Sequence, residues 1–177
     1  MKRSELEHVL RAAAAISQEN SFVVVGSQAI LLAYPHAPAE LLVSREIDLY
    51  PALHPEKADL IDGAIGAMSS FDETFGYYAD GVGPETAVMP HDWHDREQLY
   101  YFGELTVICP EVHDLAVSKC VAGRDKDADF VRALLKHGMI SLSTMIERIA
   151  LLDGAQHPLA HITQWTERRA LEAKQWI

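Results

Sequence analysis

Two acidic residues spaced two positions apart are the first feature of this sequence that could do chemistry. Glu46 and Asp48 lie in the stretch 44–50, whose composition predicts a strand. Side chains two positions apart in a strand point to the same face, so these carboxylates would lie together while Ile47 and Leu49 face the opposite way. Carboxylate oxygens are ligands that Mg²⁺ prefers. The spacing therefore predicts a clamp for a divalent metal.

A glycine and a serine earlier in the chain could bind phosphate. Gly26 and Ser27 follow the apolar run 22–25, which predicts a buried strand, and precede 28–34, a run of helix-forming residues. Backbone N–H groups at such a turn can bind an anion. A phosphate cradle beside a metal clamp is what phosphoryl and nucleotidyl transfer need. The simpler alternative is an ordinary serine-capped turn followed by a solvated strand face.

Composition limits the classes of function. The chain has 177 residues and a formal net charge of -11, which argues against broad binding to nucleic acid but not against one local basic groove or a basic partner. Cys109 and Cys120 lack the spacing of a zinc site, so we expect buried thiols in a reducing cytoplasm. No signal peptide is visible, and no apolar run approaches the roughly 20 residues of a membrane span. We therefore expect a cytoplasmic protein.

The elements that must position these residues follow from hydrophobic periodicity and turn signals. The sequence predicts strands at 22–25, 44–50, 75–80, 86–89, 99–102 and 105–109. Helices are predicted before residue 18, after Pro55, from 110 to about 152 with breaks, and from about Pro158 to the end. This order indicates an α/β (α+β) fold with a mixed or largely antiparallel sheet flanked by helices.

We expect two parts of unequal size. Residues 1–138 would form a sheet domain, and 139–177 would form a helical C-terminal extension packed on it.

The order strand, Gly-Ser, helix, strand with two carboxylates resembles the polymerase-β-like nucleotidyltransferase superfamily. There the first carboxylate is usually Asp, whereas this sequence has Glu46. A second segment, 114–135, resembles the C-terminal signature of bacterial nucleotidyltransferases that include abortive-infection toxins and uncharacterised relatives. The residues that carry this likeness are Asp114, Leu115, Lys119, Ala122, Arg124, Lys126 and Asp127, with Pro90, Trp93 and Arg96 in an earlier loop.

The resemblance implies a role for each matching residue of the first segment. Gly26 would let the backbone approach the nucleotide closely, and Ser27 would contact a phosphate. Glu46 and Asp48 would hold Mg²⁺ bridged to the triphosphate. A third strand carboxylate often completes the metal site in this superfamily, and Asp80 is the candidate here. Asp80 could instead be a turn former before a glycine.

For the second segment, the resemblance implies a positively charged residue at the active site. Lys119 matches a lysine expected to face the active site and neutralise phosphate charge, and Asp127 matches a carboxylate that supports the site or the lysine. The alternative is that Lys119 and Arg124 are surface charges paired with Asp114 or Asp127.

The implied activity is Mg²⁺-dependent transfer of NMP from an NTP to an RNA or protein hydroxyl, with a toxin–antitoxin system as one setting. In the resembling toxins the acceptor class is RNA, and in other superfamily members it is a hydroxyl of a partner toxin. A cognate toxin or antitoxin is therefore an expected partner. The acidic charge favours a protein or small-molecule acceptor over bulk RNA. The alternative is a catalytically degraded fold that binds a nucleotide or a partner.

Overall fold

The computed structural model describes residues 1–174, and its contacts divide the chain into two compact units. The first unit comprises Met1–Ala87 and Gln98–Cys109, and the second comprises Val88–Glu97 and 110–174. This division assigns the helices after residue 110 to the second unit. The division predicted from the sequence, at residues 138 and 139, is a different one and stays a prediction.

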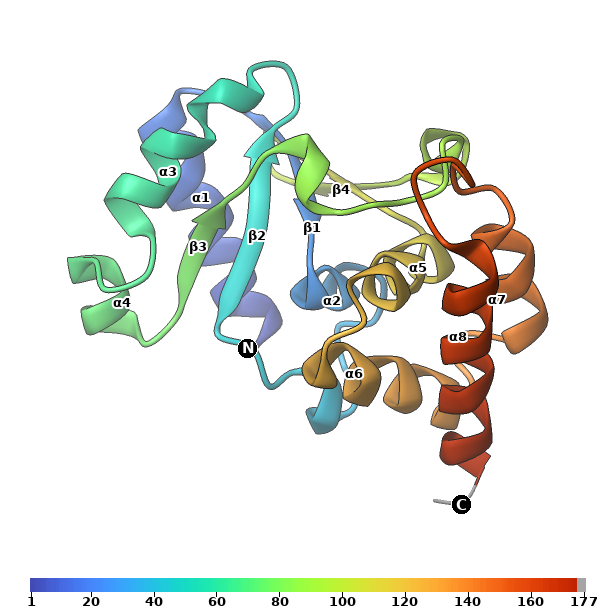
Figure 1. The fold of residues 1–177 in the computed structure, drawn as a ribbon. Helices are drawn as coiled ribbons and strands as arrows, with labels where there is room; N and C mark the ends of the chain where they lie inside the picture. Colours follow the sequence, from blue (N-terminus) through green and yellow to red (C-terminus); the bar gives the residue numbers. More distant parts are fainter. Residues whose placement is uncertain (175–177) are drawn as a thin grey trace. The chain divides into compact units, whose positions relative to one another are not determined.

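The first unit is built on a five-stranded mixed sheet in the order β3-β2-β1-β5-β4 (Figure 1). The strands are β1 (Ser21–Val25), β2 (Glu46–Pro51), β3 (Tyr78–Gly81), β4 (Gln98–Phe102) and β5 (Leu105–Cys109). The β1–β2 and β4–β5 pairs are antiparallel, whereas β1–β5 and β2–β3 are parallel. The predicted mixed sheet is confirmed.

Helices pack around this sheet, and most of them bury apolar side chains. The helices of the first unit are α1 (Arg3–Ser17), α2 (Ile30–Ala33), α3 (Ala58–Ile65) and α4 (Ser70–Phe75). Leu6, Val9 and Leu10 form one face of the predicted first helix, α1, and are 0% exposed. α1 and α3 contact each other and β3 (Figure 1). The core of the unit lies between this layer and the strands.

Two predicted strands differ from the structure. Phe75 ends the helix α4, and the strand begins only at Tyr78. Helix α4 forms because the Ser69 hydroxyl accepts a hydrogen bond from the Asp72 N–H at 3.2 Å, which caps its first turn. Residues 86–89 form no strand, since Pro84 starts a 3-10 turn (Pro84–Thr86) there.

The second unit is helical. It contains α5 (Val112–Ala122), α6 (Asp125–Lys136), α7 (Leu142–Ile149) and α8 (Leu159–Lys174), and a 3-10 turn at Trp93–Arg96. Contacts join α5 to α6 and α7, and α8 to α6 and α7. The helical C-terminal segment is confirmed up to residue 174, and the predicted continuation through 175–177 lies outside the described residues. Among residues 1–174, no helix has the length and apolarity of a membrane span.

Candidate functional site

Strand β2 separates its acidic residues from its apolar ones. Ile47 and Leu49 are 0% exposed, whereas Glu46 and Asp48 are partly exposed on the other face. The alternation is the one the sequence predicts. Both carboxylates therefore lie on the same side of the strand.

The turn after β1 lies directly against Asp48. Val25, the last residue of β1, is the register partner of Asp48, so Gly26 follows beside that carboxylate. Gly26 has φ +72° and ψ -179°, a backbone region that essentially only glycine adopts. A Cβ at Gly26 would lie 1.7 Å from Oδ2 of Asp48. Glycine is thus required both by the backbone conformation and by the close approach of the carboxylate.

Ser27 lies on a turn, as predicted, but the helix predicted over 28–34 opens with a 3-10 turn. A 3-10 turn covers Ser27–Ala29, and only then does the short α2 begin. The turn closes because the Ala29 N–H reaches the Gly26 carbonyl at 3.4 Å. The buried Gln28 side chain anchors it by donating Nε2–H to the Leu41 carbonyl at 3.2 Å. Ser27 is partly exposed at the start of this anchored turn.

Asp80 lies on the strand next to Asp48. In the parallel β2–β3 ladder, Asp48 is paired with Asp80, and Glu46 is paired with Tyr78. The alternative that Asp80 is a turn former is wrong, because Gly81 continues the ladder opposite Leu49. The register therefore brings Glu46, Asp48 and Asp80 to one region of the sheet, although the sequence separates Asp80 from the pair by more than one helix.

Tyr78 binds the first of these carboxylates. Its hydroxyl donates a hydrogen bond to Oε2 of Glu46 at 3.0 Å. Burial, followed by this hydrogen bond and the negative charge of Glu46, raises the pKa of Tyr78 to about 12. The phenol therefore stays protonated and remains a donor at neutral pH.

The donor set suits a hard cation. Mg²⁺ is commonly held by one or two carboxylates together with substrate phosphates and water. Glu46 and Asp48 offer two carboxylates, and the Gly26 backbone lies directly against the Asp48 carboxylate. Within residues 1–174, no three His, Cys, Asp or Glu side chains are gathered closely enough to hold a metal by themselves. The fit is therefore to a metal completed by phosphate oxygens.

Lys119 and Asp127 belong to the second unit and are neighbours there. The Lys119 Nζ lies 4.0 Å from Oδ1 of Asp127, which is 2% exposed. Arg124 binds the same carboxylate, donating Nε–H to Oδ2 at 2.7 Å and its backbone N–H to Oδ2 at 3.2 Å. Asp127 thus holds the first turn of α6 and lies beside Lys119, which is 12% exposed.

A second ion network in this unit is centred on Arg96, a residue for which the sequence predicted no role. Arg96 donates to Asp114 at 2.8 and 3.1 Å and to Asp92 at 2.7 and 2.8 Å. Asp114 is 0% exposed, and Arg148 lies 3.7 Å from it. Burial raises the pKa of Asp114, and the Arg96 guanidinium opposes that rise. This network ties the Trp93–Arg96 turn to α5 and α7, which is a structural role.

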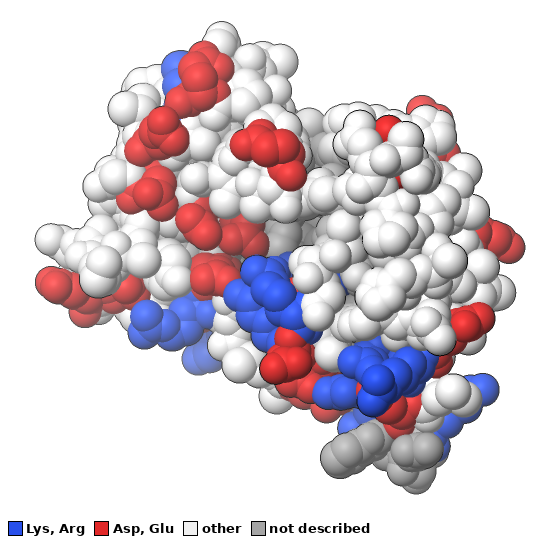
Figure 2. Space-filling model, in the orientation of Figure 1, with Lys and Arg blue, Asp and Glu red and all other residues white. Residues whose placement is uncertain are grey.

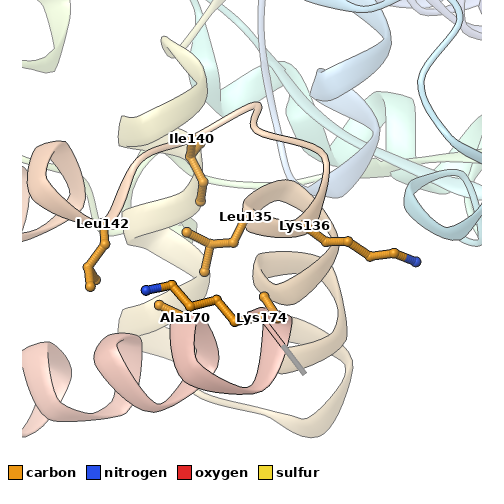
Figure 3. Close-up of a pocket in the computed structure, with 7 residues that line it drawn as sticks. Leu135, Lys136, Ile140, Leu142, Ala170 and Lys174 are labelled. Carbon is orange, nitrogen blue, oxygen red and sulfur yellow. The ribbon is translucent and has the colours of Figure 1, made fainter. Parts of the chain in front are cut away.

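One cavity of about 210 Å³ lies among α6, α7 and α8. Leu135, Ile140 and Leu142 point into it, while Lys136 points away (Figure 3). Among residues 1–174, no carboxylate, histidine or cysteine lines it, and none of the predicted site residues does. It is a mainly apolar gap between helices, with Lys136 and Lys174 as its charged lining residues within the described chain.

The five-stranded mixed sheet flanked by helices is consistent with a nucleotidyltransferase-type fold. The chain belongs to the family described as "Nucleotidyltransferase of unknown function (DUF6036)", which matches residues 4–171. Membership of a nucleotidyltransferase superfamily is thereby confirmed. The likeness to polymerase-β-like enzymes and to abortive-infection toxins stays a prediction. Searches of curated proteins and of solved structures gave no match.

Proposed function

We propose that this protein is a Mg²⁺-dependent nucleotidyltransferase that moves NMP from an NTP to an acceptor hydroxyl. The observation that carries the proposal is the convergence of three chain segments at Asp48. Gly26 packs against its carboxylate, Asp80 is its register partner, and Glu46 shares its face of β2. Family membership supports the same reaction class.

The residues of the first unit would bind and orient the triphosphate. Glu46 and Asp48 would hold Mg²⁺, with Asp80 beside Asp48 as the third carboxylate. The bound ion would neutralise charge on the phosphates and on the leaving group. Gly26 would let the backbone approach a phosphate, and Ser27 would contact it through its hydroxyl and N–H. Catalysis would come mainly from positioning and charge neutralisation.

Two further assignments rest on the resemblance. Lys119 would neutralise phosphate charge, and Asp127 would hold that lysine in place, which its 4.0 Å contact with Lys119 supports. The acceptor would be an RNA or protein hydroxyl in the cytoplasm, with a toxin–antitoxin pair as the setting. The net charge of -11 favours a protein acceptor over bulk RNA.

Calorimetric titration of the four NTPs, with and without Mg²⁺, tests the proposal. We expect metal-dependent binding by the wild type that Asp48→Asn abolishes. Asp59→Asn, at an exposed position of α3, is the matched control and should bind as the wild type does. Labelled NTP and candidate acceptors then test for transfer. The absence of NTP binding at millimolar concentration with either Mg²⁺ or Mn²⁺ would contradict the enzyme proposal.

A second candidate function is a nucleotidyltransferase fold that only binds a nucleotide or a partner. The observation that favours it is the hydrogen bond between Tyr78 and Glu46, because the hydroxyl already occupies one acceptor site of a carboxylate that a metal would need. This alternative predicts that Asp48→Asn leaves every binding measurement unchanged.

A further inference from the structure

The contact between Tyr78 and Glu46 joins two strands at the proposed metal site. The two residues are register partners in the β2–β3 ladder, and the next pair on the same face is Asp48 with Asp80. The Tyr78 hydroxyl lies 3.0 Å from Oε2 of Glu46. Tyr78 is therefore one register step from the carboxylate pair without being a candidate ligand itself.

Glu46 needs an orienting partner more than Asp48 does. A glutamate side chain has one more rotatable bond than an aspartate, and its terminal torsion is broad, so the backbone alone fixes its carboxylate poorly. Asp48 is shorter and its carboxylate lies against the Gly26 backbone. A partner that restrains Glu46 would supply the rigidity that its length removes.

The chemistry of the partner matters as well. A phenol is a neutral donor, so it can fix a carboxylate without cancelling the negative charge that a cation requires. Arg45, the adjacent residue in the chain, directs its guanidinium to Asp72 at 3.3 Å.

We propose that Tyr78 is a positioning residue for Glu46. Its hydroxyl binds one carboxylate oxygen, and Glu46 would hold the metal with the carboxylate that Tyr78 orients. This inference rests on the proposed function, because it concerns the same metal site. It also explains how the hydrogen bond between Tyr78 and Glu46, which favours the second candidate function, is compatible with Glu46 as a metal ligand.

Mn²⁺ affinity in the presence of NTP, measured by electron paramagnetic resonance, tests the inference without an activity assay. We expect Tyr78→Phe to weaken Mn²⁺ binding by roughly 10-fold or more, the usual effect of removing a partner of a metal ligand. Tyr77→Phe is the matched control, since its hydroxyl contacts His8 at 2.8 Å. That variant should bind Mn²⁺ as the wild type does.

A double-mutant cycle separates positioning from a general structural role. Glu46→Asp shortens the side chain and withdraws the carboxylate from the hydroxyl. In that background Tyr78→Phe should change Mn²⁺ affinity by no more than about twofold, because the two residues no longer interact. Thermal unfolding of each variant shows whether it remains folded.

Three results would overturn the inference. In the first, Tyr78→Phe binds Mn²⁺ as the wild type does while Asp48→Asn does not bind it, so the proposed function survives alone. In the second, Tyr78→Phe weakens Mn²⁺ binding by the same factor in the wild-type background and in the Glu46→Asp background. In the third, the wild type binds no Mn²⁺ with NTP, and the proposed function falls too.

Discussion

The two units of this protein differ in their balance of acidic and basic residues and in the partners of their carboxylates. The first carries fourteen Asp and Glu residues against five Lys and Arg, whereas the second carries twelve against ten. Acidic residues line the α3 and α4 side of the first unit, and Lys and Arg gather over α6 and α8 in the second (Figure 2). In the second unit the most buried carboxylates, Asp114 and Asp127, each bind an arginine.

The difference separates carboxylates that hold the fold from carboxylates that can serve a ligand. Burying a charge is costly unless an opposite charge and hydrogen bonds compensate it, and Arg96 and Arg124 supply this in the second unit. In the first unit Glu46 is held by a phenol, and Asp48 lies against a glycine. We therefore expect charge changes in the second unit to alter stability, and those on β2 to alter ligand binding.

Arg96→Gln should produce the largest effect. It leaves Asp114, at 0% exposure, with only the 3.7 Å contact to Arg148 described for it. Removing one partner of a buried ion pair typically costs about 3–5 kcal/mol of unfolding free energy. Urea denaturation followed by circular dichroism measures the loss.

Arg168→Gln is the matched control for this prediction. Arg168 is 76% exposed and lies 3.3 Å from Glu172, so the change should cost less than about 1 kcal/mol. If both variants lost the same stability, the Arg96 network would have no special structural role. The contrast between the carboxylates of the two units would then fail.

Gly26→Ala should come next, and its effect falls in the first unit. The new Cβ would meet Oδ2 of Asp48 at 1.7 Å, and the backbone at φ +72° and ψ -179° is unfavourable for alanine. Such strain costs about 1–3 kcal/mol, to which the clash adds. Displacement of Asp48 should also weaken metal-dependent NTP binding. Denaturation and calorimetry measure the two effects.

Gly63→Ala separates this effect from a general response to losing a glycine. Gly63 lies in α3, and a Cβ there would meet nothing within 4 Å. Alanine at this position should raise stability by about 0.5–1 kcal/mol. A stable Gly26→Ala variant with intact binding would show that the Asp48 carboxylate does not depend on this glycine.

For the first unit, the sequence predicts which residues form strands better than it predicts how those strands pair. Strands β1, β2, β4 and β5 follow from apolar runs and alternation, and the spacing of Glu46 and Asp48 fixes their shared face. Helix α4 had a readable signal in Ser69 with Asp72 three residues later, which is the spacing of a helix cap.

The register between distant strands has no comparable signal in the sequence. Periodicity assigns a residue to a face of its own strand, but the pairing of Asp48 with Asp80 depends on how β3 returns after α3 and α4. The Tyr78 contact with Glu46 follows from the same register. Arg96 and Asp114 are eighteen positions apart, and only folding shows that they form one network.

Lys119→Met tests whether a charge of the second unit takes part in binding. Asp127 would keep its bonds from Arg124, so the stability cost should stay below about 1 kcal/mol. If Lys119 neutralises phosphate, NTP affinity should fall by about 10-fold, the effect of losing one charged hydrogen bond. Calorimetry measures it, with Lys136→Met on α6 as the control. An unchanged NTP affinity would mean that Lys119 does not contribute to NTP binding.

Asp92→Asn should have the smallest effect, visible only in acid. Hydrogen bonds from Arg96 lower the pKa of Asp92 from 3.8 to about 2. A carboxyl with a lowered pKa in the folded state stabilises the fold above pH 3.8, and this contribution is lost as the pH falls towards 2. In Asp92→Asn, stability should therefore depend less steeply on pH between about 4 and 2. Urea midpoints at several pH values measure the slope, with Asp95→Asn, exposed on the same turn, as the control variant. If Asp92→Asn retained the full slope, the acid sensitivity would have to come from other carboxylates, those of the first unit included.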